Sequence, residues 1–371
     1  MKFRALIAFS LFCISSLSIA VISIPKVRGA FLYDATYAAG PSSAKTVDPG
    51  HWITNLQAFN AGATSARNQI TRLYPYSGDI EIYPKTGGGY TVYVYYVPPS
   101  KGQASVAAYK AAFPSAQEVP IIDGDTNSAL LKPLKGNAAL GVTVAQTAAN
   151  QICSDPNADG IMFDLEPFSI SDPGQFSLYH TIANLFASSQ CIDSAHPNGR
   201  YFGLFMNPNK IAAGDWSRLA AALGNNGYLI VSGYDLGPTK NPPVSINSNQ
   251  YTAGLTGMLQ TMDKESIKNK IPYDVAIPAS ASFSEFYKYG IYDPTKPGNF
   301  DLIKAFSQQL GFMHAARAVI FATCKSAYFM DVDYWSYNVY ISPKPSANQL
   351  LLPNIIDGGV MSYLQTAPPF R

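Results

Sequence analysis

Residues 159–166 read Asp159-Gly-Ile-Met-Phe-Asp-Leu-Glu166, and a proline follows at once. On an extended strand the side chains alternate between two faces, so Gly160, Met162, Asp164 and Glu166 share one face and three apolar residues share the other. A parallel strand buries such an apolar face against covering helices. The other face ends in two carboxylates at the C-terminal end of the strand, which is where a (β/α)8 barrel keeps its catalytic groups. The alternative is an acid pair that only caps a loop or meets a basic residue.

Strand-like and helix-like segments alternate from residue 118 onward, which indicates βα units and a parallel sheet. Strands are predicted at 118–123, 159–166, 200–206, 227–233, 273–278 and 357–364. Helices are predicted between them at 141–153, 174–189, 211–223, 251–266 and 299–316.

The first two barrel strands are placed within residues 30–117. Residues 70–74 are predicted to be a strand, and residues 81–83 and 91–96 form a hairpin around a glycine-rich turn. Two stretches rich in proline, serine, asparagine or aromatic residues, 238–249 and 323–350, are predicted to be insertions. The sequence therefore predicts a single (β/α)8 TIM barrel over residues 30–371 with loop insertions.

The composition fits a large globular domain and argues against several kinds of function. Of the 371 residues, 47% are hydrophobic and 13% are charged, so a large buried core is available. A net charge of +2 is too small to argue for binding to nucleic acid or to an anionic membrane surface. The histidines are scattered and the sequence shows no cluster of metal ligands, so we expect neither a metal nor a cofactor. We expect a monomer.

Residues 1–24 are predicted to be an export signal. A basic front, Met1-Lys-Phe-Arg4, precedes an apolar stretch with interspersed serines. Small-residue cleavage sites end at Ala20 or lie just before Ala30. The same segment is long enough to remain as a single membrane anchor, which is the alternative. The expected location is secreted or periplasmic.

Three cysteines follow the predicted signal: Cys153, Cys191 and Cys324. Cys153 ends the helix before the predicted strand 159–166, and Cys191 ends the helix after it. Both positions fall on the N-terminal side of a barrel, so a disulfide between them is geometrically plausible, with Cys324 free. Three free thiols are the alternative.

The octet resembles the Asp-x-x-Asp-x-Asp-x-Glu signature of the family 18 glycoside hydrolases, which include chitinases and endo-β-N-acetylglucosaminidases. The resemblance makes Asp159 the first aspartate, Asp164 the third and Glu166 the general acid. Met162 stands where the family has its second aspartate. In the family this aspartate shares a proton with the third, so Asp164 lacks that coupling here.

Later segments extend the resemblance to about residues 118–365. Tyr234 and Asp235 match the Tyr-Asp of the family's sixth strand. The segment that ends in Met206 and Asn207 resembles the fifth strand. Tyr363 lies in the predicted eighth strand, where the family usually carries a tryptophan. We therefore expect Asp235, Tyr363, Met206 and Asn207 to bind substrate, and Asp159 and Met162 to lie behind the catalytic residues.

Two acids on one strand approach a sugar from the same side, so they cannot place an acid and a carboxylate nucleophile across the scissile bond. Substrate-assisted catalysis fits that geometry. The resemblance implies that the substrate's 2-acetamido oxygen attacks while Glu166 protonates the leaving oxygen. Asp164 then orients the acetamido group, and Tyr234 holds its oxygen. The expected substrate is β-1,4-linked N-acetylglucosamine in chitin-type chains or in the N-glycan core.

Two other interpretations remain open. A barrel with impaired catalysis, as Met162 suggests, acts as a lectin for amino-sugar oligosaccharides. A hydrolase of another family takes its second carboxylate from another strand, with Asp123, Asp125 and Asp235 as candidates.

Overall fold

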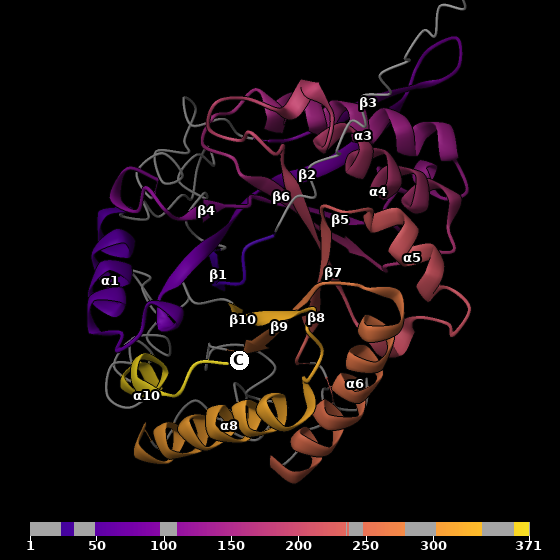
Figure 1. Ribbon diagram of the computed structural model, residues 1–371. Helices are drawn as coiled ribbons and strands as arrows, with labels where there is room; N and C mark the ends of the chain where they lie inside the picture. Colours follow the sequence, from indigo (N-terminus) through magenta and orange to yellow (C-terminus); the bar gives the residue numbers. More distant parts are fainter. Residues whose placement is uncertain are drawn as a thin grey trace, which may run out of the picture.

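A computed structural model describes residues 24–32, 49–96, 110–234, 236, 248–278, 302–335 and 360–370. Eight parallel strands follow one another in the order β1-β10-β9-β8-β7-β6-β5-β2, and pairing of β1 with β2 closes the barrel (Figure 1). The strands are β1 (Arg28–Leu32), β2 (Ile70–Pro84), β5 (Ile121–Asp125), β6 (Gly160–Glu166), β7 (Tyr201–Met206), β8 (Gly227–Ser232), β9 (Tyr273–Pro278) and β10 (Phe329–Trp335). The predicted TIM barrel is confirmed.

Helices surround the barrel (Figure 1). They are α1 (Pro49–Gly62), α3 (Ala138–Cys153), α4 (Pro173–Phe186), α5 (Trp216–Leu223), α6 (Ser248–Asn269), α8 (Leu302–Thr323) and α10 (Val360–Thr366). Short 3-10 turns span Ala66–Asn68, Lys132–Leu134, Ser189–Cys191 and Pro208–Lys210. Two further strands, β3 (Tyr90–Val94) and β4 (Gln117–Glu118), pair with β2 outside the closed ring.

The helices on either side of β6 begin at clear capping signals. The Asn137 side chain accepts a hydrogen bond from Leu140 N at the start of α3, and Asp172 accepts one from Gln175 N at the start of α4. Pro173 occupies the first turn of α4, where a missing N–H costs nothing. The two helices pack closely because Gly141 faces the backbone of Gly174, and a Cβ at Gly141 would overlap the Gly174 carbonyl oxygen.

The apolar side chains form two layers on the two faces of the barrel strands. The inner cluster takes at least one residue from each of the eight strands, which places it inside the barrel: Phe31, Tyr74, Ile121, Met162, Tyr201, Phe205, Tyr228, Ile230, Ala276 and Met330, with Ile24, Val119 and Tyr234. The outer cluster lies between the strands and the helices and includes Ile161, Phe163 and Leu165. The barrel interior is thus a packed core, as in other TIM barrels.

A buried polar network shares the interior with these apolar residues. Arg72 pairs with Asp274 at 2.5 Å, and the Tyr74 hydroxyl lies 3.0 Å from the Tyr228 hydroxyl. Tyr74 also donates to Asp333 at 3.1 Å. Burial raises the pKa of Asp333 well above its ordinary value, and the Asp274 carboxylate raises it further. Burial therefore favours the protonated form of Asp333 in the folded barrel.

The eighth strand differs from the prediction. The segment predicted as a strand at 357–364 contains helix α10, and the strand that closes the barrel is β10, inside the predicted insertion 323–350. Two aspartates make β10 read as polar, but both are buried with partners. Arg28 Nε donates to Asp331 at 3.2 Å, and Tyr74 donates to Asp333.

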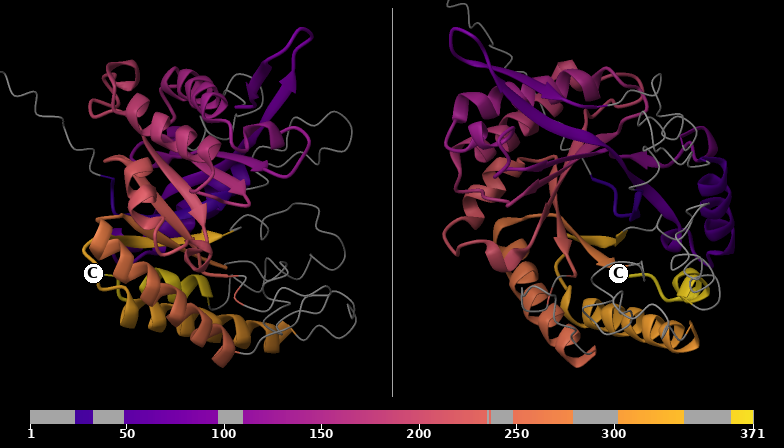
Figure 2. Two further views of the ribbon diagram at one scale, coloured as in Figure 1. Left: turned by 90° about the vertical axis from the view of Figure 1, so that its right-hand side faces the viewer. Right: turned by 180° about the vertical axis from the view of Figure 1, so that it is seen from behind.

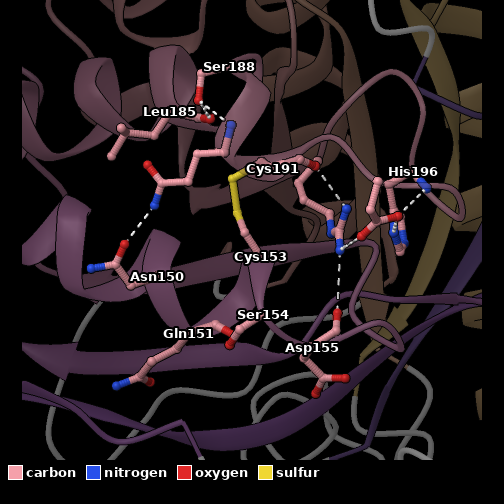
Figure 3. Close-up of a disulfide and its surroundings, with 12 residues drawn as sticks. Asn150, Gln151, Cys153, Ser154, Asp155, Leu185, Ser188, Cys191 and His196 are labelled. Atoms are coloured by element: carbon pink, nitrogen blue, oxygen red, sulfur yellow. Dashed lines mark hydrogen bonds and ion pairs between the residues drawn. A yellow bond between two sulfur atoms is a disulfide. The ribbon is translucent and has the colours of Figure 1, made fainter.

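The predicted disulfide is present and joins the ends of the βα unit around β6. Cys153 and Cys191 are bridged, with their α-carbons 4.8 Å apart (Figure 3). Arg200 donates to the Cys191 carbonyl at 3.0 Å and to the Asp155 carbonyl at 3.4 Å, beside the bridge. Cys324 is a free thiol.

The residues just before β1 are part of the folded barrel. Ile24 belongs to the inner cluster, Arg72 donates to the Pro25 carbonyl at 2.5 Å, and Lys26 donates to the Ala327 carbonyl at 2.6 Å. Within the described residues, no helix combines the length and the apolar character needed to cross a membrane.

Candidate active site

Strand β6 places its two acids as predicted. Met162 lies in the inner cluster, whereas Ile161, Phe163 and Leu165 lie in the outer one. By the alternation of the strand, Asp164 and Glu166 point to the same side as Met162. Asp164 is half-buried and Glu166, at the C-terminal end of the strand, is exposed. An exposed acid above a half-buried one is suited to meeting a ligand at this end of the barrel.

The turn after Glu166 is fixed by hydrogen bonds. Thr126 N donates to the Glu166 carbonyl at 2.7 Å. Gln175, buried in the first turn of α4, donates to the Pro167 carbonyl at 3.1 Å and accepts from Ser169 N at 2.9 Å. The backbone around Glu166 is therefore held by Thr126, which directly follows β5, and by Gln175 of α4.

Neighbouring strands bring further carboxylates into register with the β6 pair. The α-carbons of Asp123 and Asp164 are partners across β5 and β6, and so are those of Asp125 and Glu166. On the other side of β5, Asp79 of β2 is the partner of Asp123. Because partners in parallel strands face the same way and neighbouring strands are about 4.8 Å apart, these acids form a row across three strands. Asp123 and Asp125 were predicted only as candidates for the second carboxylate of a hydrolase of another family, and Asp79 was not predicted.

The row has an electrostatic consequence. Burial raises the pKa of Asp123, and the charges of Glu166, Asp79 and Asp125 raise it further. Burial also raises the pKa of Asp79, with Glu81 as the next cause. Within the described part of the chain, no lysine, arginine or histidine forms an ion pair with Asp79, Glu81, Asp123, Asp125 or Glu166. Burial thus favours the protonated carboxyl at Asp123 and Asp79.

Tyr234 lies on the inner side of the barrel. It follows β8, is buried in the inner cluster and stacks on Phe205 with ring centroids 5.8 Å apart. Ser232 donates to the Tyr234 carbonyl at 3.2 Å, and Tyr251 donates to the Gly233 carbonyl at 3.0 Å, so the turn after β8 is anchored. The predicted partner Asp235 lies outside the described residues.

Met206 and Asn207, both predicted to bind substrate, lie at the end of strand β7. Met206 lies in the outer cluster, on the side of the helices, so its prediction as a substrate-binding residue is wrong. Phe205 takes the inner position instead. Strand β7 is buried on both faces, so its apolar sequence does not reveal which residues point inward. Asn207 is half-buried just after β7 and accepts a hydrogen bond from Asn209 N at 3.0 Å.

Tyr363 is not at the barrel interior. It belongs to helix α10, its ring centroid lies 3.9 Å from that of His314 on α8, and Arg317 lies over it at 5.8 Å. The prediction that placed Tyr363 in the eighth strand as a substrate-binding residue is therefore wrong, because the segment is a helix packed outside the barrel. The residue at the C-terminal end of the eighth strand is Trp335, which lies inside the segment 323–350 that was predicted to be an insertion.

Asp159 precedes β6 and lies at the opposite end of the strand from Glu166. It pairs with Lys110 at 2.6 Å and with His196 at 3.3 Å, and it accepts from Glu118 N at 2.9 Å. Burial alone would raise its pKa, but the bonds from His196 and Lys110 lower it overall. These contacts give Asp159 a role at the N-terminal end of the barrel rather than behind Asp164.

The described residues contain no group of three or more His, Cys, Asp or Glu side chains arranged to hold a metal ion. What the arrangement offers is acid–base chemistry at the C-terminal end of the barrel, with aromatic and amide side chains nearby.

Solved structures resemble this chain at low sequence identity. The catalytic domain of the psychrophilic chitinase B from Arthrobacter TAD20 is 11% identical with a TM-score of 0.53, over 93% of this chain and 96% of that one. An endo-β-N-acetylglucosaminidase mutant from Cordyceps militaris, in complex with fucosyl-N-acetylglucosamine-Asn, is 9% identical with a TM-score of 0.47, over 93% and 92%. A glycoside hydrolase family 5 enzyme from Prevotella bryantii B14 is 14% identical with a TM-score of 0.45, over 91% and 95%. No family model matches the sequence, and no curated protein does either.

Proposed function

We propose that this chain is an exported glycosidase that hydrolyses β-1,4-linked N-acetylglucosamine, in chitin-type chains or in the N-glycan core, by substrate-assisted retaining catalysis. The observation that carries the proposal is the position of the two acids of β6. Glu166 is exposed at the C-terminal end of the strand, and Asp164 lies half-buried one step below it on the inner face. This is the end of a TIM barrel at which substrates bind.

In the proposed reaction Glu166 gives its proton to the glycosidic oxygen as the bond from the anomeric carbon to that oxygen breaks. The substrate's acetamido oxygen forms a bond to the same carbon, giving an oxazolinium ion. Asp164 accepts a hydrogen bond from the acetamido N–H and balances the developing positive charge. Water then adds to the anomeric carbon as the bond from that carbon to the acetamido oxygen breaks, which restores the acetamido group. Glu166 takes the proton from the water, and the product keeps the original configuration.

Tyr234 and Asn207 are proposed to complete the site. Tyr234, anchored in the turn after β8 beside Phe205, holds the acetamido oxygen in line with the anomeric carbon. Asn207, half-buried at the end of the fifth strand, is a further substrate contact.

Export is part of the proposal. The basic and apolar N-terminus supports it. The Cys153–Cys191 bridge also supports it, because disulfides persist mainly in oxidising compartments.

A second candidate function rests on the carboxylate row. Asp123 and Asp125 lie on the strand next to Asp164 and Glu166, as α-carbon partners. Ordinary retaining glycosidases hold their two carboxyl groups about 5–5.5 Å apart, close to the spacing of neighbouring strands. One of these aspartates would then act as the nucleophile, and the substrate would need no acetamido group.

A thiazoline analogue of N-acetylglucosamine separates the two mechanisms because it mimics the cyclised intermediate. The substrate-assisted mechanism predicts competitive inhibition. No inhibition, together with a glycosyl ester trapped on Asp123 or Asp125, would establish the second candidate. Tight binding of chito-oligosaccharides with no turnover at any pH would instead mark the protein as a lectin.

A further inference from the structure

Strand β2 extends beyond the barrel as one arm of a hairpin. Its second half pairs antiparallel with β3, with Glu81 opposite Tyr93 and Tyr83 opposite Thr91. This violet hairpin projects away from the barrel (Figure 2). Asp79 is in register with Asp123, near the C-terminal end of β5, so the residues after it run past that end of the barrel. The hairpin therefore stands beside the candidate active site.

The two faces of the hairpin have different characters. Ile80, Ile82 and Val94 are buried in the outer cluster. The opposite face carries Tyr83, Tyr93 and Tyr95, which are 38%, 46% and 43% exposed. Large aromatic side chains gathered in the open on a folded monomer usually mark a binding surface.

The three tyrosines are held in a defined arrangement. The rings of Tyr83 and Tyr93 meet edge to face at 5.8 Å, and those of Tyr93 and Tyr95 stack at 6.0 Å with 17° between their planes. The Tyr83 hydroxyl donates to Glu81 at 2.5 Å. Gly78 lets the strands approach here, because a Cβ at Gly78 would overlap the Tyr95 carbonyl oxygen.

This tyrosine face continues the carboxylate row. Asp79, Glu81 and Tyr83 alternate along β2 with the buried Ile80 and Ile82, so they share one side of the strand. Asp79 is the partner of Asp123, which is the partner of Asp164. An uninterrupted path of side chains on one side of the sheet thus leads from Asp164 out to the tyrosines.

We propose that Tyr83, Tyr93 and Tyr95, with Glu81, bind the part of a saccharide chain that extends from the cleavage point along the hairpin. The inference rests on the proposed function. A pyranose ring has an apolar face of C–H groups and a rim of hydroxyls. The tyrosine rings offer flat surfaces for such faces, and the Glu81 carboxylate accepts hydrogen bonds from hydroxyl or acetamido N–H groups.

The same face is too small for a stable protein partner. Three rings at these exposures offer on the order of 300 Å². A standard protein interface takes about 800 Å² from each partner. A single extended chain of sugars matches the narrow width of a two-stranded ribbon.

The test compares a double variant, Tyr93→Ala/Tyr95→Ala, with a control, Tyr90→Ala. Tyr90 is 40% exposed on the same hairpin but pairs with Pro84, so it belongs to the opposite face. The measured quantity is the ratio of two kcat/KM values: the value for N-acetyl-chitohexaose divided by the value for a chromogenic glycoside of the N-acetylglucosamine disaccharide. We expect this ratio to fall roughly tenfold to hundredfold in the double variant and to stay at the wild-type value in the control.

A ratio that is unchanged in the double variant, or that falls equally in Tyr90→Ala, would overturn the inference. Circular dichroism verifies that each variant is folded. If the wild-type protein hydrolyses neither substrate, the proposed function fails. Calorimetric titration with N-acetyl-chitohexaose then tests saccharide binding by the tyrosine face without reference to hydrolysis. Weaker binding by the double variant than by the control supports the inference, and equal binding overturns it.

Discussion

Loss of the Cys153–Cys191 disulfide should lower the melting temperature by about 5 °C. The bridge closes a loop of 38 residues that contains all of β6 and α4. In the chain-entropy description, closing a loop of this length stabilises the fold by about 4 kcal/mol. An unfolding entropy of about 2.1 cal/mol/K per residue over the 371-residue chain converts this to about 5 °C.

The assay is thermal unfolding of Cys153→Ser/Cys191→Ser and of the wild type in non-reducing buffer. Cys324→Ser is the matched control. Burial raises the pKa of the Cys324 thiol to about 12, so at neutral pH it is an inert protonated group. We expect a clearly smaller shift in the control. A double-serine variant that melts within about 1 °C of the wild type would refute the argument that this bridge stabilises the unit carrying the active site.

Three further predictions follow from particular positions. Met162→Asp puts a carboxylate below Asp164 on the inner face, so hydrolysis near neutral pH should rise and the pH optimum should move; a folded variant with neither change would leave Met162 as plain barrel packing. Asp333 has a raised pKa in the fold, so its protonation stabilises the protein fully below the ordinary value of 3.8, and this contribution is lost as the pH rises through the folded value. Wild type should therefore lose stability relative to Asp333→Asn as the pH rises above 3.8, and urea unfolding showing parallel curves would contradict this. Because Ile24 packs in the inner cluster, mass spectrometry of exported protein should find the leader cut before Ile24, and a mature chain beginning near Ala30 would contradict the barrel's N-terminal packing.

Much of the barrel could be predicted because its strands carry strong local patterns. Strands β6, β8 and β9 lie where the sequence placed them, and so does the hairpin of β2 and β3. The octet strand also disclosed its two faces, since acids and apolar residues alternate along it. The disulfide could be predicted because its two cysteines flank that strand at equivalent positions.

The missed features depend on partners that are remote in the sequence. Strand β10 contains two aspartates and so looks polar in the sequence. They can be buried because Arg28 and Tyr74, 303 and 259 residues away, donate hydrogen bonds to them. Strand β7 is apolar throughout, so no alternation shows that Phe205 rather than Met206 points inward. Asp79 joins the carboxylate row only because the register of β2 against β5 shifts beside Gly78. Local sequence carries none of these long-range pairings.

The most direct test of the central claim measures hydrolysis of acetylated and deacetylated chito-oligosaccharides by wild type and by Glu166→Gln. Glutamine keeps the shape of Glu166 but has no proton to transfer. We predict that the wild type cleaves only the acetylated chain. Glu166→Gln should lose at least about 10²–10⁴-fold in kcat while still binding that chain. Cleavage of the deacetylated chain at a similar rate, or a Glu166→Gln variant with near-wild-type turnover, would contradict the account.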